Sequence, residues 1–203
     1  MLTSYKAHFR KAAEAVARIF LHLGFSPNGL TLLGLALGLL TCLLFVWTRN
    51  PALFGFLMIA WGLFDALDGA LARLTDRVTK FGSYLDAMCD RVFEVAAALA
   101  VAYVSGYWAL SFLLAVGIML ISYAKSRAAM EIQISNDEWP DFMERTERGL
   151  IFAVGVILWG IFPNFSLAGK DIFFWVLLGL DLAVYGTVLQ RLLRAKRFIE
   201  SRA

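Results

Sequence analysis

Six long apolar blocks leave this sequence very few ways to fold. A block of about 20 apolar residues matches the thickness of a lipid bilayer when it forms a helix. Inside lipid every backbone N–H and C=O must find a hydrogen-bond partner within the protein, so single blocks become helices. We therefore expect an all-α, polytopic membrane protein with six transmembrane helices. They are expected near residues 29–48, 52–72, 86–105, 107–127, 149–163 and 171–190.

The composition of the chain also indicates a membrane protein. Of the 203 residues, 60% are hydrophobic and 17% are charged, whereas a soluble domain is about half apolar and about 25% charged. The net charge of +3 is too small to indicate a nucleic-acid partner. Neither a repeat nor a low-complexity segment divides the chain, so we expect a single membrane domain over residues 1–203.

Residues 4–22 have the pattern of an amphipathic helix. Apolar residues such as Tyr5, Phe9 and Phe20 recur at helical spacing, with Lys and Arg between them. We expect this helix to lie in the membrane interface, under anionic headgroups. A simple positively charged leader is the alternative. Pro27 follows the helix and suits the first position of the next one.

Lys and Arg are distributed very unevenly between the two sides of the membrane. If the amino terminus is cytoplasmic, seventeen of the nineteen fall in cytoplasmic segments, and only Arg49 and Lys170 fall outside. This is a strong positive-inside pattern, and it requires an even number of spans. We therefore expect a multi-pass protein of the cell (plasma) membrane, with both termini in the cytoplasm.

Four aspartates stand out among the apolar blocks. Asp65 and Asp68 are three residues apart, and Asp86 and Asp90 are four apart, so each pair shares one face of a helix. At about 4 Å and an effective dielectric near 20, two such charges repel by roughly 4 kcal/mol. Placing an acid in a span costs about 2.5–3.5 kcal/mol more. Bound cations would offset both costs, and an all-oxygen set favours Mg²⁺ or Mn²⁺, with room for two ions.

The aspartates belong to a longer pattern. It reads Asp-x2-Asp-Gly-x2-Ala-Arg-x8-Gly-x3-Asp-x3-Asp and runs from Asp65 to Asp90. This pattern resembles the signature of the CDP-alcohol phosphotransferases (CDP-alcohol phosphatidyltransferases), membrane enzymes that make phospholipid headgroups. The resemblance covers nearly the whole chain, because six spans after an interfacial helix are also typical of that family. It further implies a homodimer.

The resemblance implies a metal-dependent reaction. A hydroxyl of an alcohol attacks the β-phosphorus of a CDP-linked lipid, and CMP leaves. As metal ligands we expect Asp65, Asp68, Asp86 and Asp90, with Asp90 as the general base. The glycines would let the donor approach the backbone closely, and an arginine would bind phosphate. The residues expected to bind the CDP-lipid are Thr31, Asp68, Gly69, Ala72, Arg73 and Gly82.

A second, basic group suggests the acceptor. The segments S-x-x-K-x-R at 122–127 and E-R-x-E-R at 144–148 place cations at cytoplasmic helix ends, as a phosphorylated acceptor would require. They resemble the branch of the family that uses inositol phosphate, with CDP-diacylglycerol or CDP-archaeol as donor. The residues expected to hold the acceptor phosphate are Ser122, Lys125, Arg127, Arg148 and Arg191.

Several alternatives remain open at this stage. The acceptor could be glycerol 3-phosphate or serine, because residues 131–142, with Asp137, Glu138 and Asp141, depart from the inositol phosphate branch. The cations could be ordinary cytoplasmic flanks, and the glycines could serve helix packing. The acids could belong to an ion or proton transporter or to a prenyl-diphosphate transferase. Glu94 could orient a ligand, contact a cation or face water, and Asp181 has no assignment.

Overall fold

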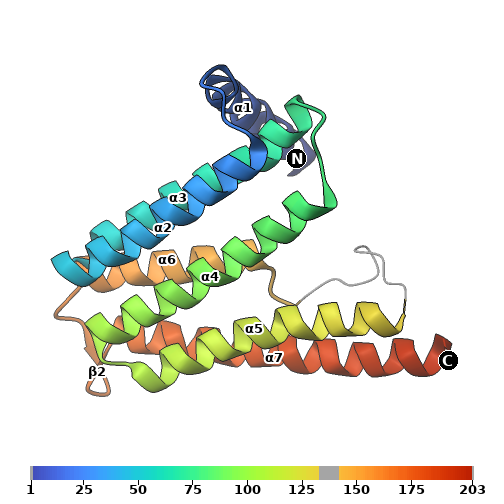
Figure 1. Ribbon diagram of the computed structural model, residues 1–203. Coiled ribbons are helices and arrows are strands. Elements are labelled where there is room, and N and C mark those ends of the chain that lie inside the picture. The colour runs from blue at the N-terminus through green and yellow to red at the C-terminus, as the bar shows by residue number, and fades with distance from the viewer. Residues whose placement is uncertain (1, 133–141, 203) are drawn as a thin grey trace.

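The computed structural model describes residues 2–132 and 142–202 of the chain. It is a bundle of seven helices with one small hairpin (Figure 1). The elements are α1 (Leu2–His22), α2 (Pro27–Thr48), α3 (Pro51–Leu74), α4 (Lys80–Ser105), α5 (Trp108–Glu131), α6 (Arg145–Ile161), β1 (Ser166–Leu167), β2 (Lys170–Asp171) and α7 (Ile172–Arg202). The predicted all-α architecture is therefore confirmed for the described residues.

Short polar residues begin the helices that carry the aspartates. The side chain of Asn50 accepts a hydrogen bond from the backbone N–H of Leu53 at the start of α3, where Pro51 occupies the first turn. Thr79 caps α4 in the same way, accepting from the N–H of Gly82 at 2.9 Å. Such caps satisfy N–H groups that have no partner inside the helix. They also fix where the motif residues fall along each helix.

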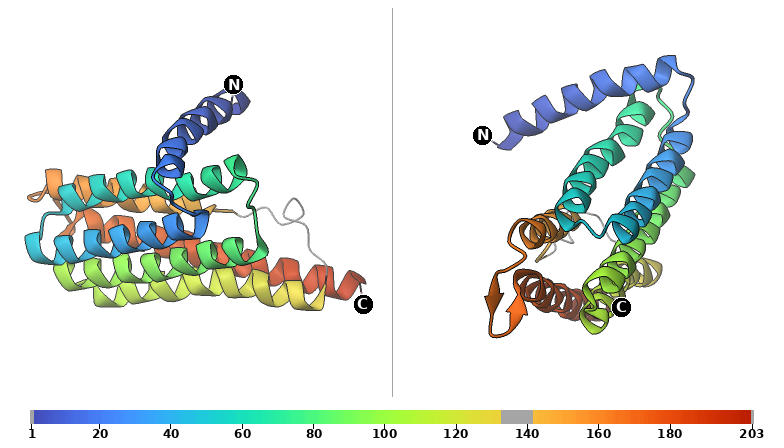
Figure 2. Two further views of the ribbon diagram at one scale, coloured as in Figure 1. Left: turned by 45° about the horizontal axis from the view of Figure 1, so that its top comes forward. Right: turned by 90° about the vertical axis from the view of Figure 1, so that its left-hand side faces the viewer.

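The six helices α2 to α7 form a closed ring. Each packs against two neighbours in the order α2, α3, α6, α7, α5, α4 and back to α2. Figure 2 shows these helices running side by side, with α1 crossing outside them and packing on α3. Elements far apart in sequence, such as α3 and α6, thereby come into contact around one interior.

The buried interior of the ring is mainly aromatic and aliphatic. Phe45 and Phe54 stack with ring centroids 4.2 Å apart, joining α2 to α3. Trp159 stacks on Phe173 at 5.1 Å, joining α6 to α7. Where α5 meets α7, a Cβ added to Gly117 would overlap the side chain of Val184. Gly117 therefore serves close helix packing, as small residues commonly do in membrane proteins.

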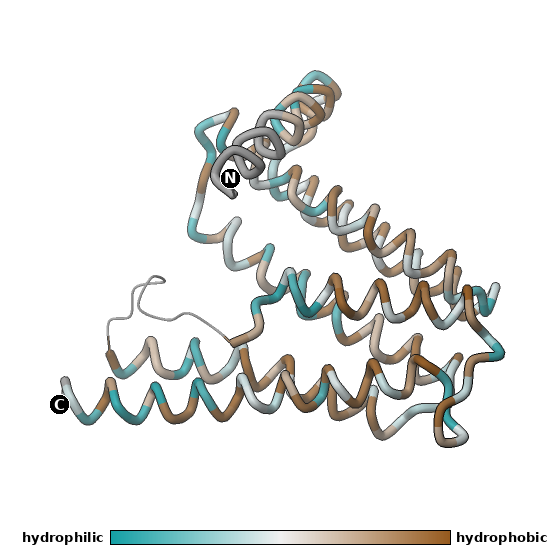
Figure 3. Tube along the Cα trace, turned by 180° about the vertical axis from the view of Figure 1, so that it is seen from behind, coloured by the Kyte–Doolittle hydropathy of each residue, from teal (hydrophilic) through white to brown (hydrophobic). Residues whose placement is uncertain are grey.

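The hydropathy of the helices fits a membrane protein (Figure 3). Apolar residues dominate much of the bundle, and hydrophilic residues gather in the loops, at the first turn of α6 and toward the C-terminal end of α7. Four helices are long and apolar enough to cross a bilayer: α2, α3, α5 and residues 172–201 of α7. The helix α6 has only 17 residues, and α4 carries charges into its second half. The six helices are thus present, whereas the six-span count stays a prediction.

The structure differs from the sequence predictions at several helix ends and in one hairpin. The helix α4 begins at Lys80, before the predicted 86, and α5 continues to Glu131, past the predicted 127. The helix α6 begins at Arg145, before the predicted 149, and ends at Ile161, before Pro163, because proline does not continue a helix. The helix α7 continues past the predicted span to Arg202. A hairpin of two strands was not predicted; its turn, Ala168 and Gly169, has positive φ at both residues, as tight hairpins require.

The amino-terminal segment is helical, its amphipathic character stays a prediction, and its described side chains show a packed face. Ala17 is fully buried, and Phe20 packs edge-on against Phe64 of α3 at 5.6 Å. Val16, on the same helix, is exposed. The side chains of residues 2–11, including the predicted Tyr5 and Phe9, lie outside the described residues. The interfacial placement of α1 therefore remains a prediction.

Candidate functional site

Three of the four predicted aspartates converge in the structure. Oxygen atoms of Asp65, Asp86 and Asp90 all lie within 4.8 Å of one another. Asp65 comes from α3 and the other two come from successive turns of α4. Asp90 is buried, whereas Asp65 and Asp86 are partly exposed. We call these three residues the acid group.

The fourth aspartate points to one side of the acid group. Asp68 accepts a hydrogen bond from the hydroxyl of Thr31 on α2, with the oxygens 2.5 Å apart. It also accepts from the backbone N–H of Gly69. Two donors thus fix the carboxylate of Asp68 at the junction of α2 and α3. Asp68 and Asp86 line one polar cavity, so the fourth aspartate lies beside the acid group, outside the set of three.

The polar cavity has a volume of about 180 Å³ and lies between the ends of α2, α3 and α4. Its lining contains every residue that the sequence predicted to bind the CDP-lipid: Thr31, Asp68, Gly69, Ala72, Arg73 and Gly82. Arg77 and Asn28 also line it and were not predicted. At Gly69, an added Cβ would meet only Arg73 Nη1, at 3.4 Å. Gly69 therefore faces open space, unlike the tightly packed Gly117.

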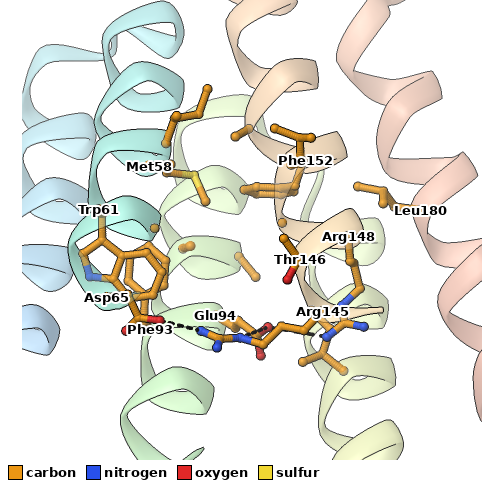
Figure 4. Close-up of a pocket in the computed structure, with 18 of the residues that line it drawn as sticks. Met58, Trp61, Asp65, Phe93, Glu94, Arg145, Thr146, Arg148, Phe152 and Leu180 are labelled. Atoms are coloured by element: carbon orange, nitrogen blue, oxygen red, sulfur yellow. Dashed lines mark ion pairs between the residues drawn. The ribbon is translucent and has the colours of Figure 1, made fainter. Parts of the chain in front are cut away.

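A second, apolar cavity of about 520 Å³ lies inside the ring of helices. Met58, Phe152 and Leu180 line its apolar part, and charged side chains form its lower edge in the view of Figure 4. Asp65 belongs to that edge. The acid group therefore adjoins the apolar cavity through Asp65 and the polar cavity through Asp86. This cavity was not predicted, because residues from five helices line it.

Arg145 and Glu94, which were not among the predicted site residues, lie between the acid group and Arg148. Arg145, in the first turn of α6, forms ion pairs with Asp90 and with Asp65, the latter at 3.5 Å. It also lies 3.7 Å from Glu94 (Figure 4). Glu94 pairs with Arg91 and, at 3.5 Å, with Arg148. Glu94 therefore contacts cations, which settles one of the alternatives left open.

A signal for Arg145 was present in the sequence. The segment Glu144 to Arg148 places Arg145 and Arg148 three residues apart, on one face of a helix. Only the packing of α6 against α3 turns that face toward the acids.

The residues predicted to bind the acceptor phosphate are spread over three helices. Arg148 is buried and lines the apolar cavity beside Glu94. Arg191 is buried and donates to the backbone carbonyl of Ile121, one residue before Ser122. Arg127 is exposed and pairs with Glu131 on its own helix at 2.5 Å. Lys125 is partly exposed on the same helix. The structure thus brings Arg148 next to Glu94, whereas Arg127 pairs within its own helix.

The acid group fits a hard divalent cation. Within the described residues it contains carboxylate oxygens and neither His nor Cys. Three carboxylates within 4.8 Å of one another repel unless cations neutralise them. Oxygen-only sets of this kind suit Mg²⁺ and Mn²⁺ better than softer metals. Cys89, which precedes Asp90, is buried as a free thiol outside this group.

Comparisons with known proteins point to one family. Residues 25–185 match the model of the CDP-alcohol phosphatidyltransferase family. Over 202 residues the chain is 30% identical to the archaetidylinositol phosphate synthase of Pyrococcus horikoshii, covering 98% of this chain and 99% of that one. The structure resembles that of phosphatidylinositol phosphate synthase from Mycobacterium tuberculosis with CDP-DAG bound, with a TM-score of 0.80, 26% identity, and coverage of 91% and 94%. The structure of the same enzyme in complex with manganese and citrate matches with a TM-score of 0.79 and 27% identity. The match covers 90% of this chain and 88% of that one.

Proposed function

Because the chain belongs to the CDP-alcohol phosphatidyltransferase family, we propose that it transfers a lipid phosphate from a CDP-linked lipid to a hydroxyl of inositol phosphate. CMP is the second product. The observation that carries this proposal is the convergence of all six predicted donor residues on one cavity that adjoins the acid group. The whole chain serves this one reaction, as a single membrane domain.

The two cavities suit the two halves of a CDP-linked lipid. The polar cavity, with Arg73 and the hydroxyl of Thr31, would take the nucleotide and its phosphates. The apolar cavity would take alkyl chains, since hydrophobic side chains form most of its lining. Asp65 and Asp86, at the borders of the two cavities, would then lie beside the diphosphate. The donor would reach the site sideways from the lipid, as CDP-diacylglycerol or CDP-archaeol.

We assign the metal to the four aspartates. Asp65, Asp86 and Asp90 would hold it, and Asp68 would add an oxygen from the polar cavity. When bound, the ion neutralises the diphosphate and the charge that develops on the leaving CMP. We propose that two ions bind, either Mg²⁺ or Mn²⁺. The manganese in the similar solved structure supports a divalent metal of this class.

We assign the general base to Asp90. It is buried at the meeting point of α4, α3 and the start of α6. From there its carboxylate would take the proton of the attacking hydroxyl. Arg148 lies beyond Glu94 on the same side and would hold the phosphate of the acceptor. Ser122, Lys125, Arg127 and Arg191 complete the proposed acceptor set. Glycerol 3-phosphate is the next acceptor to consider, followed by serine.

The placement in the membrane is also a proposal. We infer six spans, with α1 in the interface and with the acid group and both termini in the cytoplasm of the cell. Arg49 lies in the link between α2 and α3, and Lys170 lies in the hairpin before α7. Few cations in these links support an outer side with little positive charge. A homodimer is expected from the resemblance, and crosslinking in native membranes would check it.

One experiment tests the proposed function directly. The purified protein is given CDP-diacylglycerol or CDP-archaeol, Mg²⁺, and one acceptor at a time, and release of CMP is measured. Inositol phosphate should support turnover, and free inositol should not, because only the former offers an anion to the basic side. Turnover with glycerol 3-phosphate or serine, and none with inositol phosphate, would replace the acceptor and keep the reaction. Ion flux without CMP release would contradict the reaction itself.

A further inference from the structure

Arg145 lies against the acid group. Its guanidinium contacts Asp90 and Asp65, two members of the acid group. A divalent cation held by the acid group would coordinate oxygens of the same two carboxylates. Arg145 and a metal ion therefore compete for one pair of carboxylates, because a guanidinium and a divalent cation cannot both approach those oxygens closely.

The surroundings of Arg145 allow it to move away from the acids. Its side chain is 36% exposed, whereas the side chain of Arg148, one turn later on α6, is 5% exposed. Arg145 already lies 3.7 Å from Glu94, which also holds Arg148 at 3.5 Å. A rotation about the flexible stem of Arg145 would thus bring its guanidinium beside Arg148 without a change in the backbone of α6.

We propose that Arg145 is an internal counter-cation of the acid group, which leaves Asp65 and Asp90 when a divalent cation binds and then joins Arg148 in binding the phosphate of the acceptor. The proposal rests on the proposed function in placing the metal at the acid group and in the acceptor phosphate that Arg145 then binds. It assigns Arg145 a role in acceptor specificity that becomes available once the metal is bound. Metal binding and acceptor binding are then coupled through one side chain.

The first test measures metal binding without any turnover. Mn²⁺ affinity of the purified protein is determined by electron paramagnetic resonance, in the absence of lipid and acceptor. Arg145→Gln should bind Mn²⁺ about tenfold more tightly than the wild type, because the competing cation is gone. Arg145→Lys keeps the charge and should stay within about threefold of the wild type. Unchanged or weaker Mn²⁺ binding by Arg145→Gln would overturn the proposal.

Arg148→Gln is the matched control for charge alone. It removes the same charge from the same face of α6, but Arg148 pairs with Glu94 and with neither Asp65 nor Asp90 in the described contacts. Its effect on Mn²⁺ affinity should therefore stay below about threefold. Equal gains in Arg145→Gln and Arg148→Gln would show that general electrostatics, and not displacement of Arg145, sets the affinity, and this outcome would also overturn the proposal.

A second measurement uses the wild-type protein and so does not depend on the folding of a variant. Phenylglyoxal, which modifies accessible arginines, is applied with and without saturating Mn²⁺, and modification of Arg145 is quantified by mass spectrometry. The proposal predicts severalfold faster modification with Mn²⁺, because Arg145 has left its ion pairs. Equal or slower modification would overturn it. Both measurements read metal binding, so a chain that transferred to none of the acceptors would refute the proposed function and leave the displacement of Arg145 by the metal standing.

Discussion

The two sides of the site are built in different ways. On the donor side, the polar cavity is shaped by small residues and backbone from α2, α3 and α4, which follow one another in the chain. On the acceptor side, Arg145 and Arg148 of α6 form ion pairs with Glu94 of α4. Donor-side recognition therefore depends on shape and on fixed carboxylates, whereas acceptor-side recognition depends on charges that can exchange partners.

The sharpest way to break this comparison is to remove one fixed carboxylate on the donor side. Asp68→Asn should lower the turnover number by about a thousandfold or more, because a metal ligand and a neighbour of the diphosphate are lost together. CMP release from purified protein measures this loss. The fold should survive, since an amide can still accept from Thr31.

Asp76→Asn provides the matched control for that experiment. Asp76 is exposed eight residues further on, and its positive φ of 51° is one that Asn adopts readily. This variant should retain nearly wild-type turnover.

Near-normal turnover in Asp68→Asn would mean that Asp68 is not a metal ligand. Asp90→Asn should behave like Asp68→Asn, because the general base is lost.

A smaller effect is expected when a charge on the acceptor side is changed. Arg148→Lys should raise the KM for inositol phosphate by about ten- to hundredfold, because an ammonium group lacks the fork that binds phosphate at two points. The KM for the CDP-lipid should change little, and Arg73→Lys should show the reverse pattern. Lys196→Gln, at an exposed cation paired with Glu200 on α7, is the control that should change neither constant. A rise in both KM values in either arginine variant would show that the two sides are not separate.

The same division explains which parts of the site the sequence could predict. Asp65, Asp68, Asp86 and Asp90 lie on two helices joined by a short link, so their i, i+3 and i, i+4 spacings already place them on shared faces. The contacts of Arg145 with Asp65 and Asp90 depend on α6 packing beside α3. Residue spacing within a helix does not predict which helices pack together. The helices themselves were predictable because lipid allows little else.

The apolar cavity was unpredictable for a related reason. Leu114, Phe152 and Leu180 line it from α5, α6 and α7, yet residues of the same kinds face lipid elsewhere on these helices. Hydrophobicity alone does not separate a residue that faces lipid from one that faces a cavity, because both surroundings are apolar. The predicted acceptor set has the same weakness, since a cytoplasmic flank and a phosphate ligand are both basic.

Two glycines allow the shape argument to be tested more finely. Gly69→Ala should raise the KM for the CDP-lipid severalfold and leave the thermal midpoint nearly unchanged, because the added methyl group points into the open polar cavity. Gly117→Ala should lower the thermal midpoint and leave the KM for the CDP-lipid nearly unchanged, since its methyl group would overlap Val184. Overpacking of this kind costs about 1–3 kcal/mol of stability. Thermal unfolding in detergent and donor titrations measure the two effects. If both variants lost only stability, Gly69 would be a packing residue.

The smallest effect concerns an acid that belongs to neither side. Asp181 lies on α7, next to Leu180 of the apolar cavity; it is 5% exposed, and neither of its oxygens has a hydrogen-bond partner among the described residues. A buried polar group without a partner costs about 1–3 kcal/mol, so Asp181→Leu should raise the thermal midpoint by a few degrees and leave both KM values unchanged. Asp181→Asn, which keeps the polar group, should raise it less. A fall in stability in both variants would mean that Asp181 stabilises the packing of α7. A loss of turnover would instead give Asp181 a role in the reaction, although it lies far in sequence from the Asp65–Asp90 motif.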